Sequence, residues 1–155
     1  LLTKKDILQN AIDFAHALDI KQPKVAILAA VEEVKPQMQS TIDAAALCKM
    51  ADRGQITGAL LDGPLAFDNA ISQQSADIKH IHSPVTGDVD ILLVPDLEAG
   101  NMLGKQLIYL GEAKAAGIVM GSKVPIVLTS RSDDELDRLY SIALGAYVAQ
   151  KRKQA

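Results

Sequence analysis

The chain has 155 residues and a net charge of −3, so it lacks the general basic surface with which nucleic-acid-binding proteins attract phosphates. Hydrophobic residues make up 48% and aromatic residues only 3%, which is enough for one ordinary domain with an aliphatic core. No apolar run approaches the roughly 18 residues that a membrane-spanning helix needs, and the single cysteine, Cys48, fits a reducing, cytoplasmic compartment.

Helical and extended patterns alternate along the chain. Apolar residues at helical spacing follow Thr3, Ser40, Phe67, Pro95 and Ser132. Thr3, Ser40 and Ser132 each have an acidic residue three positions later, the pattern of a capping box. Short apolar runs predict buried strands at residues 24–29, 57–61, 91–94, 115–120 and 125–129. This alternation predicts an α/β fold, a mostly parallel sheet with helices on both faces.

The stretch 90–107 combines a buried strand with a polar end. The apolar run 91–94 is ended by Pro95, which cannot donate to a strand ladder. Asp96, Glu98 and Asn101 follow where the strand gives way to a helix. Ligands of open α/β sheets bind at the carboxyl ends of the strands, so a binding site is expected here.

A second polar group, Ser130-Arg131, follows the last predicted strand. An arginine at a strand end suits bidentate contact with a phosphate or a carboxylate. Acidic residues at 133–135 would repel a phosphate, however, so the residues alone leave an anion site and a surface salt bridge equally open. Asp137 borders the apolar stripe of the final helix formed by Leu136, Leu139, Tyr140, Ala143, Leu144 and Tyr147.

Metal and nucleotide signatures are weak in this sequence. His80-x-His82 would place two imidazoles on one side of a strand, but no spaced cysteine or nearby carboxylate pattern completes a site. Neither a G-x-G-x-x-G nor a Walker A pattern occurs. We therefore expect no metal site. Asp62 and Asp68 also follow a predicted strand end, where turn formation and helix capping are the simpler explanations.

Three ordered blocks together resemble the phosphate acetyl/butyryl transferase family. They are residues 62–70, beginning Asp-Gly-Pro-Leu-Ala, residues 94–101, Val-Pro-Asp-Leu-Glu-Ala-Gly-Asn, and residues 125–131, ending Thr-Ser-Arg. The resemblance extends over about residues 24–149. The wording of the first and last blocks is most similar to the phosphate butyryltransferase branch.

The resemblance implies an acyltransferase that interconverts acyl-CoA plus phosphate and acyl phosphate plus CoA. Coenzyme A is then a substrate, and neither a metal nor an organic cofactor is needed. Arg131 would bind the phosphoryl group, Ser130 would hydrogen-bond the reacting carbonyl or phosphate, and Asp137 would act as general base toward the CoA thiol. Ser132 departs from the acetyl branch, which has Gly there. The resemblance also places substrate-binding positions at Asp62, Asp68, Glu98, Asn101 and Lys105.

The resemblance further implies a two-lobed fold like that of isocitrate and isopropylmalate dehydrogenases, and a homodimer. Residues 1–155 would be the carboxy-terminal part of such an enzyme, with the amino-terminal half absent and the fragment inactive alone. Alternatives are a phosphate acetyltransferase, or a non-catalytic acyl-CoA-sensing domain like those that follow malic enzyme domains. A metal-dependent decarboxylating dehydrogenase is a third alternative, on fold grounds only.

Overall fold

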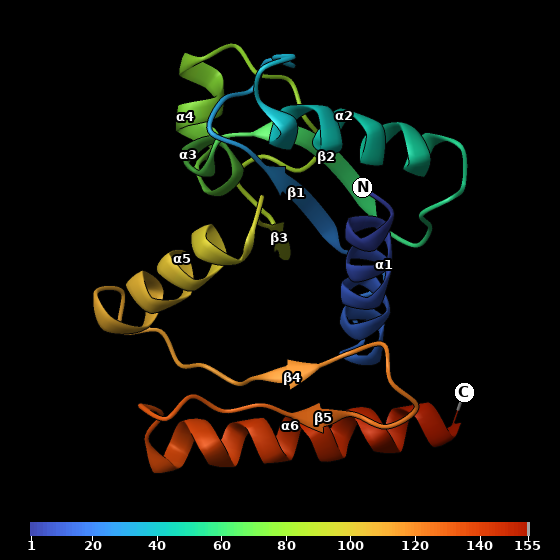
Figure 1. Ribbon diagram of the computed structural model, residues 1–155, viewed down its shortest axis with the longest axis vertical. Helices are drawn as coiled ribbons and strands as arrows, with labels where there is room; N and C mark the ends of the chain where they lie inside the picture. The colour runs from blue at the N-terminus through green and yellow to red at the C-terminus, as the bar shows by residue number, and fades with distance from the viewer. Residues whose placement is uncertain (155) are drawn as a thin grey trace. The chain divides into compact units, whose positions relative to one another are not determined.

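The computed structural model describes residues 1–154 and divides the chain into two compact units. The first unit is Leu1–Ala99, and the second begins at Gly100. Helix α5 (Leu97–Tyr109) starts at the end of the first unit and continues into the second (Figure 1). Among the helices of residues 1–154, none is both long enough and apolar enough to cross a lipid bilayer.

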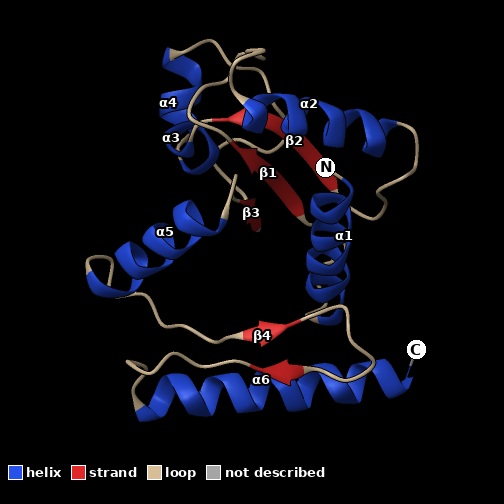
Figure 2. Ribbon diagram, viewed as in Figure 1, coloured by secondary structure: helices blue, strands red, loops and turns tan. Residues whose placement is uncertain are grey.

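The first unit is built from helices and parallel strands in alternation. Its elements are α1 (Leu2–Ala17), β1 (Lys24–Leu28), α2 (Gln39–Asp52), β2 (Leu60–Leu65), α3 (Phe67–Ile71), α4 (Gln73–Ile78) and β3 (Ile91–Leu93). The strand order is β2-β1-β3, with both pairs parallel (Figure 2). Val25 of the central strand is in register with Leu61 on one side and Ile91 on the other. The predicted α/β class and the strands at 24–29 and 91–94 are thus confirmed.

Strand β2 corrects one prediction. The Asp62-Gly63-Pro64 segment, which predicts a turn, lies inside this strand, and the Gly63–Pro64 peptide bond is cis. Proline is tolerated because β2 is an edge strand of the three-stranded sheet, where a ladder donor can be missing. Gly63 is required by close packing, because a Cβ there would lie 2.7 Å from the carbonyl oxygen of Ile27.

The core of the first unit lies between the sheet and two helices. Leu8 and Ile12, four residues apart on α1, are fully buried in one cluster with Leu47 of α2. Val25 and Ile27, two residues apart on β1, supply the sheet side of the same cluster. These are the helical and strand periodicities that bury one face of each element.

The strands predicted at 115–120 and 125–129 do not join the parallel sheet of the first unit. The two strands of the second unit, β4 (Ile118–Val119) and β5 (Ile126–Val127), pair antiparallel, with Ile118 in register with Val127. Both strands are two residues long and neither is buried; Ile126 is 48% exposed. The connection between them is too short for the crossover of a dozen or more residues that a parallel pair needs, so a hairpin forms instead.

Helix α6 (Glu135–Gln154) packs on this hairpin with an unexpected face (Figure 1). The buried positions are Asp137, Ser141 and Val148, together with Gly145, where a Cβ would lie 2.7 Å from Cγ2 of Val127. The predicted apolar stripe is largely exposed instead, with Leu139 57% accessible. Small and polar residues allow a helix to approach a neighbouring strand closely. The face of α6 that packs on the hairpin is therefore the one with Gly145, Asp137 and Ser141.

The predicted caps at Thr3, Ser40 and Ser132 are wrong, the last because α6 begins only at Glu135. The first helix begins at Leu2 and the second at Gln39, and neither has a side-chain cap. Aspartate side chains cap the first turns of α5 and α6 instead. Asp96 accepts a hydrogen bond from the N–H of Ala99 at 2.8 Å, and Asp134 accepts one from the N–H of Asp137 at 2.8 Å.

Candidate functional site

Three segments begin at the carboxyl edge of the parallel sheet. The loop 29–38 follows β1, α3 follows β2, and the Asp96 turn into α5 follows β3. The chain crosses from β2, on one side of β1, to β3 on the other, so the strand order reverses around β1 (Figure 2). Ligands of open α/β sheets bind at such a switch point, beside the central strand.

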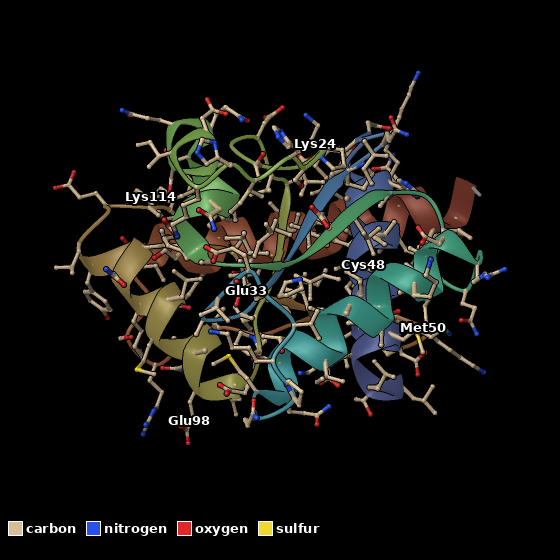
Figure 3. The ribbon with its side chains drawn as sticks, turned by 90° about the horizontal axis from the view of Figure 1, so that it is seen from above. Lys24, Glu33, Cys48, Met50, Glu98 and Lys114 are labelled. Atoms are coloured by element: carbon tan, nitrogen blue, oxygen red, sulfur yellow. The ribbon has the colours of Figure 1, made fainter. Side chains whose placement is uncertain are left out.

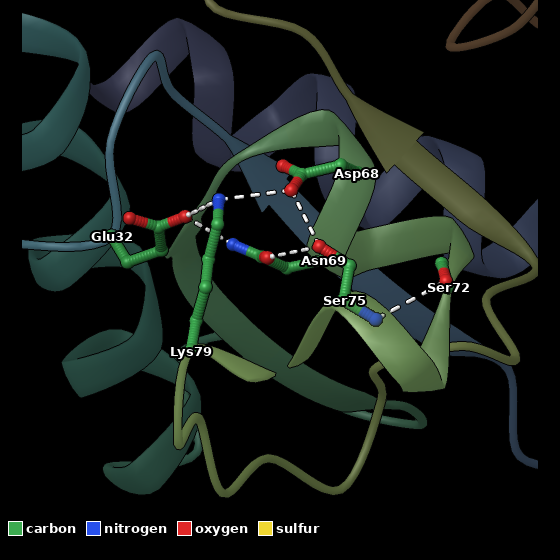
Figure 4. Close-up of polar contacts among 6 residues, drawn as sticks. All are labelled: Glu32, Asp68, Asn69, Ser72, Ser75 and Lys79. Atoms are coloured by element: carbon green, nitrogen blue, oxygen red, sulfur yellow. Dashed lines mark hydrogen bonds and ion pairs between the residues drawn. The ribbon is translucent and has the colours of Figure 1, made fainter. Parts of the chain in front are cut away.

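A network of five side chains joins two of these segments. We call it the Lys79 network: Glu32 in the loop after β1, Asp68 and Asn69 in α3, Ser75 in α4, and Lys79 at the end of α4 (Figure 4). Nζ of Lys79 lies 2.8 Å from Oε1 of Glu32 and 2.9 Å from Oδ2 of Asp68. One cation therefore bridges a carboxylate of the β1 loop and a carboxylate of α3.

Asn69 is the buried centre of the Lys79 network. Its side chain has no solvent-accessible surface, and its Nδ2 donates a hydrogen bond to Oε1 of Glu32. Its Oδ1 lies 3.1 Å from the hydroxyl of Ser75, which is also 2.5 Å from Oδ2 of Asp68. A buried amide is costly unless both its ends are paired, so this geometry fixes Glu32 and Ser75 with respect to α3.

The charges of the Lys79 network stabilise one another. Hydrogen bonding from Lys79 lowers the pKa of Glu32 below its usual value. The pKa of Asp68 is also lowered, first by the hydrogen bond from Ser75 and then by Lys79. Glu32 and then Asp68 raise the pKa of Lys79 in turn. All three groups therefore stay charged around neutral pH.

Asp62 and Cys48 (Figure 3) both contact the backbone of Gly63 in β2. Oδ1 of Asp62 accepts a hydrogen bond from the N–H of Gly63 at 2.8 Å, and Sγ of Cys48 lies 3.5 Å from the Gly63 carbonyl oxygen. Burial, and secondarily the charge of Asp62, raises the pKa of Cys48 to about 12. The thiol is thus protonated at neutral pH, which makes Cys48 a poor nucleophile.

Helix α5 carries three of the predicted substrate-binding residues. Glu98, Asn101 and Lys105 are all exposed, and their spacing of three and four residues places them on one side of the helix. Figure 3 shows the side chain of Glu98 pointing away from the ribbon. Nζ of Lys105 lies 5.9 Å from the ring centroid of Tyr109, within cation–π range.

Ser130 and Arg131 are exposed in the turn that leads into α6. The N–H of Ser130 donates to Oδ2 of Asp133 at 2.5 Å, which holds this carboxylate against the backbone of the turn. The Ser130 hydroxyl lies 3.0 Å from that of Ser132. Within residues 1–154, Arg131 forms no ion pair, which argues against the surface salt bridge that the sequence left open.

Asp137 faces inward, toward the segment that leads into β4. Asp137 is only 8% exposed, and its Oδ1 accepts a hydrogen bond of 3.3 Å from the N–H of Ala115. One turn later, the hydroxyl of Ser141 accepts from the N–H of Gly117 at 3.0 Å and donates to the Asp137 carbonyl at 2.8 Å. The second carboxylate oxygen of Asp137 has no protein partner within residues 1–154.

The structure groups the predicted site residues by unit. Asp62 and Asp68 belong to the first unit, and Ser130, Arg131 and Asp137 to the second. Their roles in binding and catalysis stay predictions. Sequence reasoning missed Glu32, Asn69, Ser75 and Lys79. Only Asn69 gave any signal, because it falls inside the 62–70 block.

Residues 2–146 match the family model described as phosphate acetyl/butaryl transferase. The chain belongs to this family. It is 60% identical over 155 residues to phosphate acetyltransferase of Rhizobium meliloti and 52% identical over 147 residues to the probable phosphate butyryltransferase of Bacillus subtilis. These matches cover 100% and 95% of this chain but only 49% of each relative, so the chain spans about half their length.

The fold is also similar to that of a solved family structure. A branched-chain phosphotransacylase from Enterococcus faecalis V583 superposes with a TM-score of 0.87 at 36% identity, over 96% of this chain and 53% of that one. Acetyl- and butyryltransferases both match, so identity does not select a branch. The assignment of the chain to the carboxy-terminal part of such an enzyme stays a prediction.

Proposed function

We propose that the protein interconverts acyl-CoA plus phosphate and acyl phosphate plus CoA. The observation that supports this best is the family match over residues 2–146, which includes Ser130, Arg131 and Asp137. The guanidinium of Arg131, which is exposed and forms no ion pair with any described residue, is suited to a phosphoryl group, because its planar fork offers two parallel hydrogen bonds.

The proposed chemistry is a direct acyl transfer within a ternary complex. The CoA sulfur attacks the carbonyl carbon of the acyl phosphate, a C–S bond forms, and the C–O bond to phosphate breaks. Arg131 neutralises the charge that develops on the leaving phosphate, and Ser130 donates to the carbonyl or phosphate oxygen. Asp137 takes the proton of the thiol, whose ordinary pKa of about 8.5 requires only modest assistance.

The geometry around Asp137 supports the role of a base. Oδ1 accepts from the Ala115 N–H and so fixes the carboxylate plane, while the other oxygen has no protein partner within the described residues. A proton acceptor must be held in place and yet keep one oxygen available to its substrate. We therefore assign the thiol proton to Oδ2.

For the acyl group, we propose butyryl or a branched chain of four or five carbons. The support is the similarity to the Enterococcus faecalis branched-chain phosphotransacylase and the Bacillus subtilis probable butyryltransferase, together with the wording of blocks 62–70 and 125–131. Acetyl is the second candidate, favoured by the 60% identity to the Rhizobium meliloti phosphate acetyltransferase.

An acyl-CoA series from C2 to branched C5, supplied with phosphate, separates these candidates. Each additional buried methylene contributes roughly 0.8 kcal/mol, so the proposed preference amounts to about tenfold for two carbons. Equal or higher kcat/KM for acetyl-CoA would favour the second candidate. A non-catalytic acyl-CoA sensor would bind the same ligands without releasing CoA.

We further propose that the active protein is a two-lobed homodimer of the isocitrate and isopropylmalate dehydrogenase type, and that it needs neither a metal nor an organic cofactor. Activity is proposed to require more polypeptide than these 155 residues. In support, the chain spans about half the length of its relatives, and residues from Gly100 onward leave many large apolar side chains exposed.

A further inference from the structure

The loop that follows β1 is anchored at both of its ends. At its start, Glu32 accepts from Asn69 and pairs with Lys79. At its end, the hydroxyl of the fully buried Thr41 accepts from the N–H of Lys35 at 2.9 Å and lies 2.8 Å from the carbonyl oxygen of Met38. Residues 33–37 are all exposed, and among them Lys35 is held through its backbone by Thr41.

The anchoring side chains come from distant parts of the sequence. Lys79 follows Glu32 by 47 residues and Asn69 follows it by 37. An exposed loop of this kind would by itself be mobile, because ordering each residue costs about 1–2 kcal/mol of conformational entropy. Cross-links from another helix pair are the means by which a scaffold holds an exposed loop in one conformation.

We propose that Lys79 is a positioning residue, which holds exposed loop 33–37 in the conformation that binds acyl-CoA at the carboxyl edge of the sheet. This inference rests on the proposed function. The loop follows the central strand β1, at the switch point where ligands of such sheets bind. Lys79 itself need not touch substrate, because its ammonium group is already shared by Glu32 and Asp68.

A positioning role makes a kinetic prediction that differs from a structural one. If only a fraction of molecules hold the competent loop, the apparent affinity falls by that fraction, while substrate at saturation restores the competent state. Lys79→Met should therefore raise KM for acyl-CoA by about threefold to tenfold and leave kcat within about twofold. A purely structural ion pair would lower the melting temperature and leave KM unchanged.

The amino ends of the sheet strands, opposite the carboxyl ends, offer a matched control for Lys79→Met. Lys24, the first residue of β1, pairs with Asp88 at 2.8 Å, the same distance as Lys79 to Glu32. The two lysine side chains are similarly accessible, at 33% and 40%. Lys24→Met removes an ion pair of similar length at the amino ends of the strands. Lys24 begins β1 and loop 33–37 follows the other end of that strand, so KM for acyl-CoA should not change.

The experiment compares wild type, Lys79→Met, Glu32→Gln and Lys24→Met in the intact protein. Amide hydrogen exchange of residues 29–38 is measured with and without saturating acyl-CoA, together with KM, kcat and the melting temperature. We expect faster exchange and raised KM in Lys79→Met, a smaller rise in Glu32→Gln, and exchange restored to the wild-type rate by acyl-CoA. Lys24→Met should leave both quantities unchanged.

Two results would overturn the inference while the proposed function stands. One is an active Lys79→Met enzyme with wild-type KM, and the other is unchanged exchange in residues 29–38. Wild-type protein that releases no CoA from any acyl-CoA in the presence of phosphate would overturn the proposed function itself, and this inference with it.

Discussion

Asp137 and Ala115 are joined by a hydrogen bond of 3.3 Å that runs from the backbone of the β4 approach to a side chain of α6. The residue that we propose as the base thus also joins two elements of the second unit. Any account of Asp137 must separate its contribution to stability from its contribution to chemistry.

The substitution Asp137→Asn separates the contribution to stability from the contribution to chemistry. Asn keeps an oxygen that can accept from the Ala115 N–H, but it cannot take a proton. We expect Asp137→Asn to lower kcat about 100-fold or more, within the usual range for loss of a general base, while the melting temperature changes little.

Ser141→Ala is the complementary control for this prediction. It removes the acceptor for the Gly117 N–H and should lower stability by about 1–3 kcal/mol without a comparable loss of kcat. If Asp137→Asn retained a rate within about threefold of wild type, Asp137 would be a structural residue and not the base.

Arg131 tests the phosphate side of the mechanism. Arg131→Lys keeps the charge but loses the planar pair of donors. Loss of about 3–4 kcal/mol of transition-state stabilisation corresponds to a decrease of roughly 100- to 1000-fold in kcat/KM for phosphate. Stability should hardly change, since the side chain is exposed.

Arg138→Lys is the control for Arg131→Lys, because Arg138 is likewise an exposed arginine and lies in the first turns of α6, seven residues after Arg131. Its substitution should leave kcat/KM for phosphate at the wild-type value. Near-normal kinetics in Arg131→Lys itself would remove this residue from the active site.

Cys48 gives a prediction about stability at high pH. Its folded pKa is raised to about 12 from an ordinary value of 9.0, so the unfolded state loses the thiol proton first as the pH rises. The contribution of Cys48 to stability is therefore complete below pH 9 and decreases between pH 9 and 12. Cys48→Ala should show a shallower decline of the unfolding free energy over this range than wild type does.

The comparison of wild type with Cys48→Ala cancels the titration of lysines and tyrosines common to both proteins. Identical slopes above pH 9 would mean that the thiol is not held protonated by the fold. Reaction with a thiol reagent at pH 8 should likewise be slow in native protein and fast after unfolding.

Metal removal is expected to have no effect on the rate. The proposed acyl transfer includes no step that uses a metal ion, so treatment with a chelator should leave kcat unchanged. Loss of activity in chelator, followed by recovery with magnesium or zinc, would replace this mechanism with a metal-assisted one.

Local pattern was a good guide where an element is decided by its own residues. The runs 24–29 and 91–94 became β1 and β3 because continuous apolar segments fit a strand that helices cover. The strand predicted at residues 57–61 lies instead at Leu60–Leu65. Pro64 is typical of a turn and so ended the predicted strand too early, whereas an edge strand tolerates proline.

Long-range contacts explain most of what the sequence did not show. Glu32 and Lys79 are 47 residues apart, and no spacing rule connects a loop residue to the end of a later short helix. The face of α6 was misassigned for a related reason: Asp137 and Ser141 are buried where they accept hydrogen bonds from the N–H groups of Ala115 and Gly117, in the segment before β4. The Ser130-Arg131 pair could be predicted because its place after a strand and its family motif are both local features of the sequence, and its role stays a prediction.

The most direct test of the proposed function is the stoichiometry of a single reaction. Intact protein is mixed with butyryl-CoA, with and without phosphate, and CoA release and acyl phosphate formation are followed together. We predict that CoA and acyl phosphate appear in equal amounts, and that neither forms without phosphate. CoA release that is independent of phosphate, or binding of butyryl-CoA with no release, would contradict the assignment as a phosphate acyltransferase.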